Sequence, residues 1–213
     1  MPDCCDPRGY EAVFSDRFAR RVARRYRKRG LNPTSSRIVQ FLVEHGVAGA
    51  TVLEIGGGVG ELHLELLRRG ASRATNLEIS SSYEQEAARL LQQSGMADRV
   101  TRRRLDIARA PDEVEPADVV VLHRVVCCYP DYDRLLSSAG SHARRALVYS
   151  HPANNAVTRS VIWSENLLRR VTGNSFRAYV HPSEAMVRAA ESTGLTATYR
   201  HHSASWDVVG LVR

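Results

Sequence analysis

The feature that most restricts the fold of this 213-residue chain is a glycine-rich turn between a short apolar run and an amphipathic segment. The apolar run ends at Ile55, the turn reads Gly56-Gly57-Gly58-Val59-Gly60, and apolar residues then recur with helical spacing from Glu61 onward. This pattern predicts a strand, a tight turn and a helix. Such a turn lets a ligand approach the backbone closely at the carboxyl end of a parallel strand.

The spacing of the glycines distinguishes between nucleotide-binding turns. A dinucleotide-binding fingerprint would need glycine or alanine where Glu61 or His63 stands, and a phosphate-binding Gly-Lys-Ser/Thr is not present. The remaining pattern, Glu-x-Gly-x-Gly-x-Gly from Glu54 to Gly60, resembles the first motif of class I S-adenosylmethionine (SAM) dependent methyltransferases. The resemblance implies that the turn, with Gly57 in it, packs against the amino acid end of SAM and that Glu54 contacts that end directly or through water. The alternative is a sharp turn with no ligand.

Two further acids follow at strand ends. Glu78 lies about twenty residues beyond the turn, where a carboxylate commonly accepts hydrogen bonds from ribose hydroxyls, and Ile79 stands beside it. Asp106 follows a third expected strand, and the methyltransferase resemblance implies that it contacts the adenine amino group while Ile107 packs on the ring. A solvated acid at a strand end, or a helix-capping aspartate, would explain each acid without a cofactor.

Strands and helices alternate through the rest of the chain, which predicts parallel strands with helices on both faces. We expect an α/β, Rossmann-like class I methyltransferase fold with a seven-stranded, mostly parallel sheet and two extra N-terminal helices. The chain is expected to be a single domain, 1–213, with an N-terminal helical arm at 1–46 and a core at 50–213 that carries a lid insertion at 155–181. The expected strands are 50–55, 73–78, 99–104, 117–122, 145–150, 195–201 and 205–212, and the expected core helices are 60–69, 80–94, 131–142, 157–171 and 182–192.

The N-terminal arm combines apolar and basic residues. Phe14, Phe18, Val22 and Tyr26 recur every four residues, which predicts one amphipathic helix over 10–28. Asn32 and Pro33 begin a second helix, as its cap and its first residue. Arginines fill the other faces of the first helix and provide much of the net charge of +7. Such a face can bind nucleic acid or other anions, but a solvated helix face is the simpler explanation.

The segment after the expected fourth strand carries the residues best placed for chemistry. His123 follows the buried run 118–122 directly, and histidine is suited to accept a proton near neutral pH. It could equally pack against SAM or bond to the backbone. Arg124 could bind an acceptor carboxylate or face solvent, and we expect Tyr129 and His181 to contact the acceptor as well. An Asn/Asp-Pro-Pro-Tyr clamp for a flipped base is missing after this strand.

The four cysteines form two adjacent pairs, Cys4-Cys5 and Cys127-Cys128. Neighbouring cysteines chelate metals poorly, so we expect no metal site. Cys127-Cys128 would lie close to the acceptor, where thiols could exchange with a thiol or dithiol substrate. Small core residues are the alternative. The chain also resembles small actinobacterial methyltransferases of specialised metabolism, some of which methylate thiols, and this favours S-methylation.

A second resemblance covers residues 50–213. His123, the pair Tyr129-Pro130, the strand 146–150, the segment 177–181 and the final strand around Trp206 are similar to magnesium-protoporphyrin O-methyltransferases. The resemblance implies that a tyrosine of the N-terminal arm and the histidine after strand four are catalytic, which here means Tyr10 or Tyr26 and His123. The basic helix and Cys4-Cys5 depart from that family. An O-methyltransferase acting on a carboxylate or hydroxyl, tetrapyrrole-like or phenolic, is therefore the alternative to S-methylation.

Composition limits the remaining classes of function. The chain has no run of 18 apolar residues and no charged-then-apolar leader, so we expect a cytoplasmic protein without a membrane partner. It is expected to act on a small molecule as a monomer or homodimer, with SAM as cofactor and S-adenosylhomocysteine as product. Two alternatives stay open. One is an RNA methyltransferase that uses the basic helix, and the other is a protein that binds SAM without catalysis.

Overall fold

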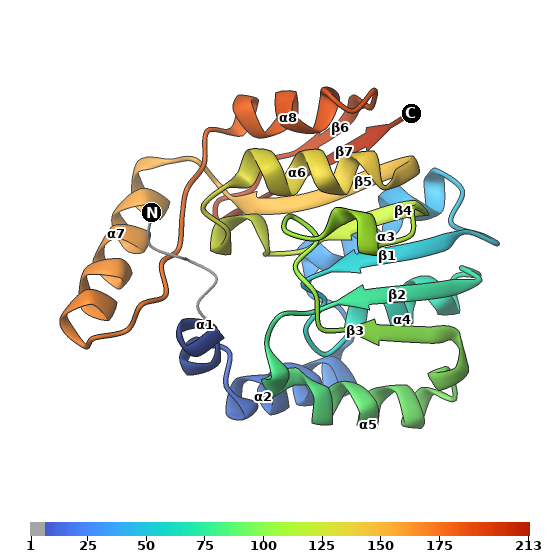
Figure 1. Ribbon diagram of the computed structural model, residues 1–213, viewed down its shortest axis with the longest axis horizontal. Coiled ribbons are helices and arrows are strands. Elements are labelled where there is room, and N and C mark those ends of the chain that lie inside the picture. The colour runs from blue at the N-terminus through green and yellow to red at the C-terminus, as the bar shows by residue number, and fades with distance from the viewer. Residues whose placement is uncertain (1–6) are drawn as a thin grey trace.

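The computed structural model describes residues 7–213, and within them seven strands form one sheet (Figure 1). The strand order is β3-β2-β1-β4-β5-β7-β6. Strands β1 to β5 run parallel, and only β7 is antiparallel to its neighbours β5 and β6. The strands are β1 (Thr51–Ile55), β2 (Arg73–Leu77), β3 (Val100–Arg103), β4 (Ala117–Leu122), β5 (Ala143–Pro152), β6 (Thr196–His201) and β7 (Trp206–Val212).

Helices cover both faces of the sheet because the central strands carry apolar side chains on both faces. Alternate residues of β4 point to opposite sides, so Val120 and Leu122 belong to one cluster and Val119 and Val121 to the other. The first cluster is covered by α6 and α8, and the second by α3 and α4. These helices are α3 (Pro33–Glu44), α4 (Glu61–Arg68), α6 (Tyr132–Ser141) and α8 (Ser183–Glu191), while α5 (Glu84–Ser94) packs with α2 (Asp16–Arg29) in a third cluster.

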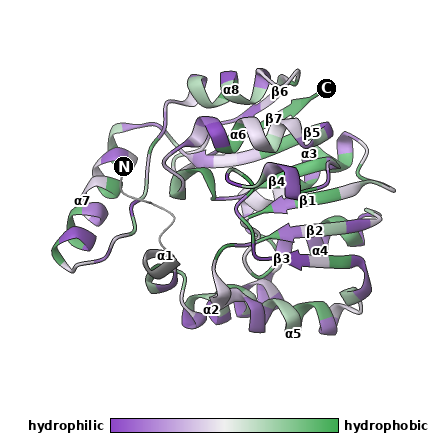
Figure 2. Cartoon of the chain, viewed as in Figure 1, coloured by the Kyte–Doolittle hydropathy of each residue, from purple (hydrophilic) through white to green (hydrophobic). Residues whose placement is uncertain are grey.

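The architecture confirms the predicted fold class, with one difference in the arm. The helix predicted over 10–28 is two helices, α1 (Pro7–Val13) and α2 (Asp16–Arg29). Ser15 has the extended backbone of a helix cap, with φ −73° and ψ 166°, so the chain turns between them. The second predicted start is confirmed, because the Asn32 side chain accepts hydrogen bonds from the backbone N–H groups of Thr34 and Ser35. Hydrophilic residues run along α2 (Figure 2).

Helix α7 (Ala156–Val171) stands beside the sheet rather than on it (Figure 1). The chain returns from α7 through residues 174–181, and this return segment is tied back to the helix. Asn166 donates to the Ala178 carbonyl over 2.7 Å and accepts from the Ala178 N–H over 2.9 Å. None of the described helices is long and apolar enough to cross a membrane.

Candidate functional site

The glycine turn lies at the carboxyl ends of the central strands and has little room for side chains. Gly56, Gly58 and Gly60 have φ of 65°, 54° and 90°, which L-residues rarely adopt. A Cβ atom added to Gly57 would lie 1.8 Å from Nδ2 of Asn76. The turn therefore requires glycine for its conformation and for its packing, as the sequence predicts.

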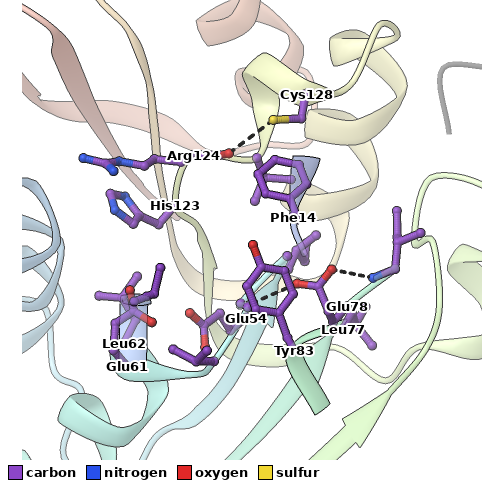
Figure 3. Close-up of a pocket in the computed structure, with 18 of the residues that line it drawn as sticks. Phe14, Glu54, Glu61, Leu62, Leu77, Glu78, Tyr83, His123, Arg124 and Cys128 are labelled. Atoms are coloured by element: carbon purple, nitrogen blue, oxygen red, sulfur yellow. Dashed lines mark hydrogen bonds between the residues drawn. The ribbon is translucent and has the colours of Figure 1, made fainter. Parts of the chain in front are cut away.

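A cavity of about 220 Å³ opens above this turn. Its walls come from α1 and α2, the turn, the ends of β2 and β3, and the segment after β4 (Figure 3). Among the residues expected to bind the cofactor, Gly60 alone does not line the cavity; it caps α4 instead. Those that line it are Glu54, Gly56, Gly57, Gly58, Glu78, Ile79, Asp106, Ile107 and His123.

Glu78 is held in one orientation by the backbone. Its Oε2 accepts the Gly58 N–H over 2.9 Å, and its Oε1 accepts the N–H groups of Ile79 and Ser80 over 2.8 and 2.9 Å (Figure 3). Burial raises the pKa of this carboxyl, and the three N–H donors oppose the rise. A carboxylate has about four lone-pair sites, so Glu78 can still accept one further hydrogen bond, on Oε2.

The other two expected acids are partly engaged inside the protein. Oε2 of Glu54 lies 2.5 Å from Nδ1 of His63, and both side chains are buried. Sequence reasoning missed this pair, because His63 was considered only as a mismatch to a dinucleotide fingerprint. Asp106 accepts the Tyr129 hydroxyl over 3.0 Å and the Ala108 N–H over 3.0 Å.

His123 connects the segment after β4 to two other elements of the core. Its Nε2 lies 3.1 Å from the Ser35 hydroxyl of α3, and its Nδ1 lies 2.9 Å from the Ser150 hydroxyl of β5. Burial, together with the charge of Arg124, lowers the pKa of His123 to about 3. The ring is therefore neutral at physiological pH, with both nitrogens engaged. A group with so low a pKa is a weak base, and the catalytic role of His123 stays a prediction.

Glu61 is a cavity residue that sequence reasoning missed. It is the first residue of α4 and lines the cavity near Glu54 (Figure 3). Burial first, and then the charge of Glu54, raises the pKa of Glu61 to about 7, against the opposing effects of its own N–H and of Arg124 and Arg25. A pKa near neutrality is what a general base needs. The only sequence signal was an acid directly after the last glycine of the turn.

The two arm tyrosines line the cavity, and both hydroxyls bond to protein. Tyr10 donates to the Cys128 carbonyl over 2.7 Å. Tyr26 donates to Glu65 over 2.8 Å and accepts from Arg68 over 2.5 Å. Burial and Glu65 raise the pKa of Tyr26 above its ordinary value. The predicted catalytic roles of both tyrosines stay predictions.

The residues expected to contact the acceptor divide into two groups. Arg124 and Tyr129 line the cavity, whereas Cys127 and His181 do not. His181 lies behind the wall, with its Nε2 2.8 Å from the Tyr129 carbonyl. The guanidinium of Arg124 lies 4.6 Å from the ring centre of Trp206, and the φ of Arg124, 59°, is the only left-handed value of a non-glycine residue within 7–213.

The cysteine pair is buried at this wall. The Cys127 and Cys128 sulfur atoms lie 3.6 Å apart, and only Cys128 reaches the cavity. A hydrogen bond with Cys127, together with burial, raises the pKa of the Cys128 thiol well above its ordinary value. The thiolate, which is the reactive form, is therefore disfavoured at Cys128. Cys4-Cys5 lies outside the described residues.

An aromatic cluster over the cavity was also missed as part of the site. The Phe14 ring centre lies 5.8 Å from that of Phe18, 6.4 Å from that of Tyr83 and 5.5 Å from that of Phe176. Phe14, Phe18 and Tyr83 line the cavity, while Phe176 packs behind Phe14 and Tyr10. No residue of the predicted lid, 155–181, lines the cavity. The lid is connected to the site indirectly, through the contacts of Phe176 with Tyr10 and Phe14.

A cavity above a glycine turn, at the carboxyl ends of a β3-β2-β1-β4-β5-β7-β6 sheet, defines a class I methyltransferase architecture. The family model for the methyltransferase domain matches residues 10–199, and the chain belongs to that family. The predictions of a SAM-dependent methyltransferase and of SAM as its cofactor are confirmed at this level.

Known proteins similar to this chain fall into two sets. Ribosomal protein L11 methyltransferase of Escherichia coli is 32% identical over 92 residues, which is 43% of this chain and 30% of that protein, so the match spans less than a third of that relative. Magnesium protoporphyrin IX methyltransferase of Synechocystis PCC 6803, solved with bound S-adenosylhomocysteine, has a TM-score of 0.67 and 22% identity over 84% of this chain and 81% of that one. An O-methyltransferase family protein of Burkholderia thailandensis has a TM-score of 0.71 and 19% identity over 96% and 62%. At these identities the structures show the fold alone.

Proposed function

We propose that this chain transfers a methyl group from SAM to an oxygen atom of a small, largely apolar acceptor that carries a negative charge. The observation that carries the proposal is the composition of the cavity: an aromatic wall from the arm, two guanidinium groups and one carboxyl group with a pKa near neutrality. SAM supplies a methyl group on a positively charged sulfur, which leaves as the neutral thioether of S-adenosylhomocysteine.

The residues of the turn fit this cofactor. Gly57 leaves no room for a side chain against Asn76, so the backbone itself forms the floor of the cavity. Glu78 has one lone-pair site left to accept a ribose hydroxyl. Asp106 would accept the adenine amino group, and the buried Ile107 would pack on the adenine ring. Glu61 and Glu54 lie where a positively charged group would be stabilised.

The acceptor would lie under the arm. Phe14, Phe18 and Tyr83 offer rings for an apolar body and exclude water from the reacting atoms. Arg124 and Arg25 both line the cavity, and each guanidinium can pair with a carboxylate. Alignment of the acceptor oxygen with the methyl group is the main contribution that such a reaction requires from the protein. The arm and the 155–181 segment, joined through Phe176, would close this side of the site.

Glu61 would take the proton when the acceptor is a hydroxyl group. Its raised pKa matches working pH, whereas the pKa of His123 is about 3 and both of its ring nitrogens are bonded. His123 would then position the segment after β4 rather than accept a proton. A carboxylate acceptor, already ionised, would need no base.

S-methylation, which the sequence favours, has less structural support. Its argument depends on thiols that exchange with substrate, but Cys127 does not line the cavity and the Cys128 thiol has a raised pKa. A thiol acceptor would also make less use of the Glu61 carboxyl, because thiols ionise more readily than alcohols.

The test is a screen of matched acceptors. Hydroxybenzoates, their mercapto analogues, the corresponding uncharged amides and a transfer RNA mixture are each incubated with SAM, and S-adenosylhomocysteine formation is measured. We expect turnover with the hydroxy acids, at least tenfold lower kcat/KM for their amides, and none with RNA. Turnover confined to the mercapto compounds or to RNA would refute the proposal.

A further inference from the structure

Helix α7 presents its apolar side to solvent. None of its residues is buried, and six large apolar side chains are between 47% and 77% exposed: Val157, Val161, Trp163, Leu167, Leu168 and Val171. The side that faces the protein is the more polar one. Asn166 bonds to the backbone of Ala178, and the guanidinium of Arg169 lies 5.2 Å from the Phe176 ring centre. An ordinary surface helix has the opposite arrangement. Figure 2 shows that hydrophobic and hydrophilic residues alternate along α7.

The exposed residues follow a seam that is symmetric about its middle. Val157, Val161, Ser164, Leu167 and Val171 are spaced by four, three, three and four residues, and Leu168 lies on the same apolar face. Steps of three and four residues are typical of a helix that packs along another helix. If a second α7 packs antiparallel with Ser164 opposite Ser164, Val157 faces Val171 and Val161 faces Leu167. The small serine at the centre lets the two backbones approach. A two-fold axis requires such a self-complementary surface.

We propose that two copies of this chain pair through α7 in an antiparallel helix contact about a two-fold axis. The six exposed side chains offer roughly 700 Å² of apolar surface per molecule, close to the ~800 Å² that each partner gives to a standard interface. With 3.6 residues per turn, Arg159, Glu165 and Arg170 lie to the sides of the seam, so pairing buries no unpaired charge. Among the described residues nothing else covers this face.

Pairing through α7 would leave the cavity accessible, and α7 would stay connected to the cavity wall through the return segment. No residue of α7 lines the cavity. The return segment runs from α7 to Phe176, which packs against Tyr10 and Phe14 of the arm. Fixing α7 against a second copy therefore fixes the segment on which the arm rests. The inference does not depend on the identity of the acceptor.

The experiment is sedimentation velocity of the full-length chain across about 0.5 to 50 μM. We expect a species of twice the 23.7 kDa chain mass at the upper concentrations. Leu168→Glu places a charge on the apolar face of both copies, next to the seam, and should raise the dissociation constant roughly 100-fold or more. Arg159→Glu, a charge change on the same helix beside the seam, should leave it within about threefold. Circular dichroism melts verify that both variants fold.

A cross-link tests the register. Ser164→Cys, treated with the thiol oxidant diamide, should give a peptide disulfide-linked to its own copy through position 164, identified by mass spectrometry against the native cysteine background. Several results would overturn the proposal. One is a monomer at every concentration, and another is a dimer that Leu168→Glu leaves intact. A monomer that binds anionic lipid vesicles only when Leu168 is present would assign the face to a membrane surface instead.

Discussion

Replacing Glu61 with glutamine should stabilise the protein at alkaline pH and leave it almost unchanged at acidic pH. The pKa of Glu61 is about 7 in the folded protein and 4.5 for the free side chain. The folded state therefore binds this proton more tightly than the unfolded state, and stability falls as pH rises from about 4.5 to about 7. At 1.36 kcal/mol per pKa unit the full loss is about 3 kcal/mol. Glutamine cannot ionise and escapes this loss.

The assay is urea unfolding of Glu61→Gln and the parent chain, without cofactor, at pH 5 and pH 8. Between these pH values the advantage of the variant should grow by about 2 kcal/mol, which is roughly 4–8 °C in melting temperature for a chain of this size. Glu115→Gln, at an exposed position, is the matched control and should show no such trend. An advantage that stays constant within about 0.5 kcal/mol would show that the folded protein does not hold the Glu61 proton near neutrality.

Three further variants test the cavity walls. Gly57→Ala forces a methyl group against Asn76 and should abolish SAM binding in calorimetry while lowering stability by about 1–3 kcal/mol; normal SAM affinity would contradict the packing argument. Glu78→Gln replaces an acceptor of three N–H groups by an amide that can match only part of them, and should weaken SAM at least about tenfold with a smaller effect on melting temperature. Arg124→Gly loses the contact with Trp206 but relieves a left-handed backbone, so the melting temperature should hardly change. The KM of a charged acceptor should rise about tenfold, because a guanidinium that pairs with it is lost. An equal rise for the uncharged amide of that acceptor would refute charge recognition.

The glycine-turn side of the cavity was predictable from sequence because local rules govern it. A glycine turn, an acid at the end of the next strand and an apolar residue after the third are each set by backbone geometry at the end of one strand. The strands themselves lie within about two residues of their predicted ends, since buried parallel strands leave short apolar runs. These features depend little on which side chains meet across the fold.

The chemistry of the acceptor side depends on which side chains come into contact across the fold. Sequence reasoning did not predict all of these contacts. The pKa of Glu61 follows from burial and from Glu54 seven positions earlier, and neither effect has a sequence signature. The low pKa of His123 arises because α3 and β5 enclose the ring between them. The break at Ser15 was also hidden, because the four-residue apolar period continues through it and only the cap conformation reveals it.

The arm tyrosine offers a direct test of whether the arm closes the site or takes part in the chemistry. The hydroxyl of Tyr10 donates to the Cys128 carbonyl over 2.7 Å, in the segment that follows β4 and forms one wall of the cavity. This hydrogen bond joins α1 to the segment after β4 at the wall of the cavity. Removing it with Tyr10→Phe keeps the ring and its contact with Phe176, and should cost about 1 kcal/mol, the net value of a typical hydrogen bond.

If Tyr10 only holds the arm closed, that cost appears as about a fivefold rise in the acceptor KM, with kcat and SAM affinity almost unchanged. If its hydroxyl exchanges a proton with the acceptor, kcat falls by a hundredfold or more, because general acid–base groups contribute about 10²–10⁴ to the rate. Steady-state kinetics with one hydroxylated acceptor separate the two. A carboxylate acceptor provides the control, because it has no proton to lose, so a large fall in its kcat would show that Tyr10 acts on alignment rather than on proton transfer.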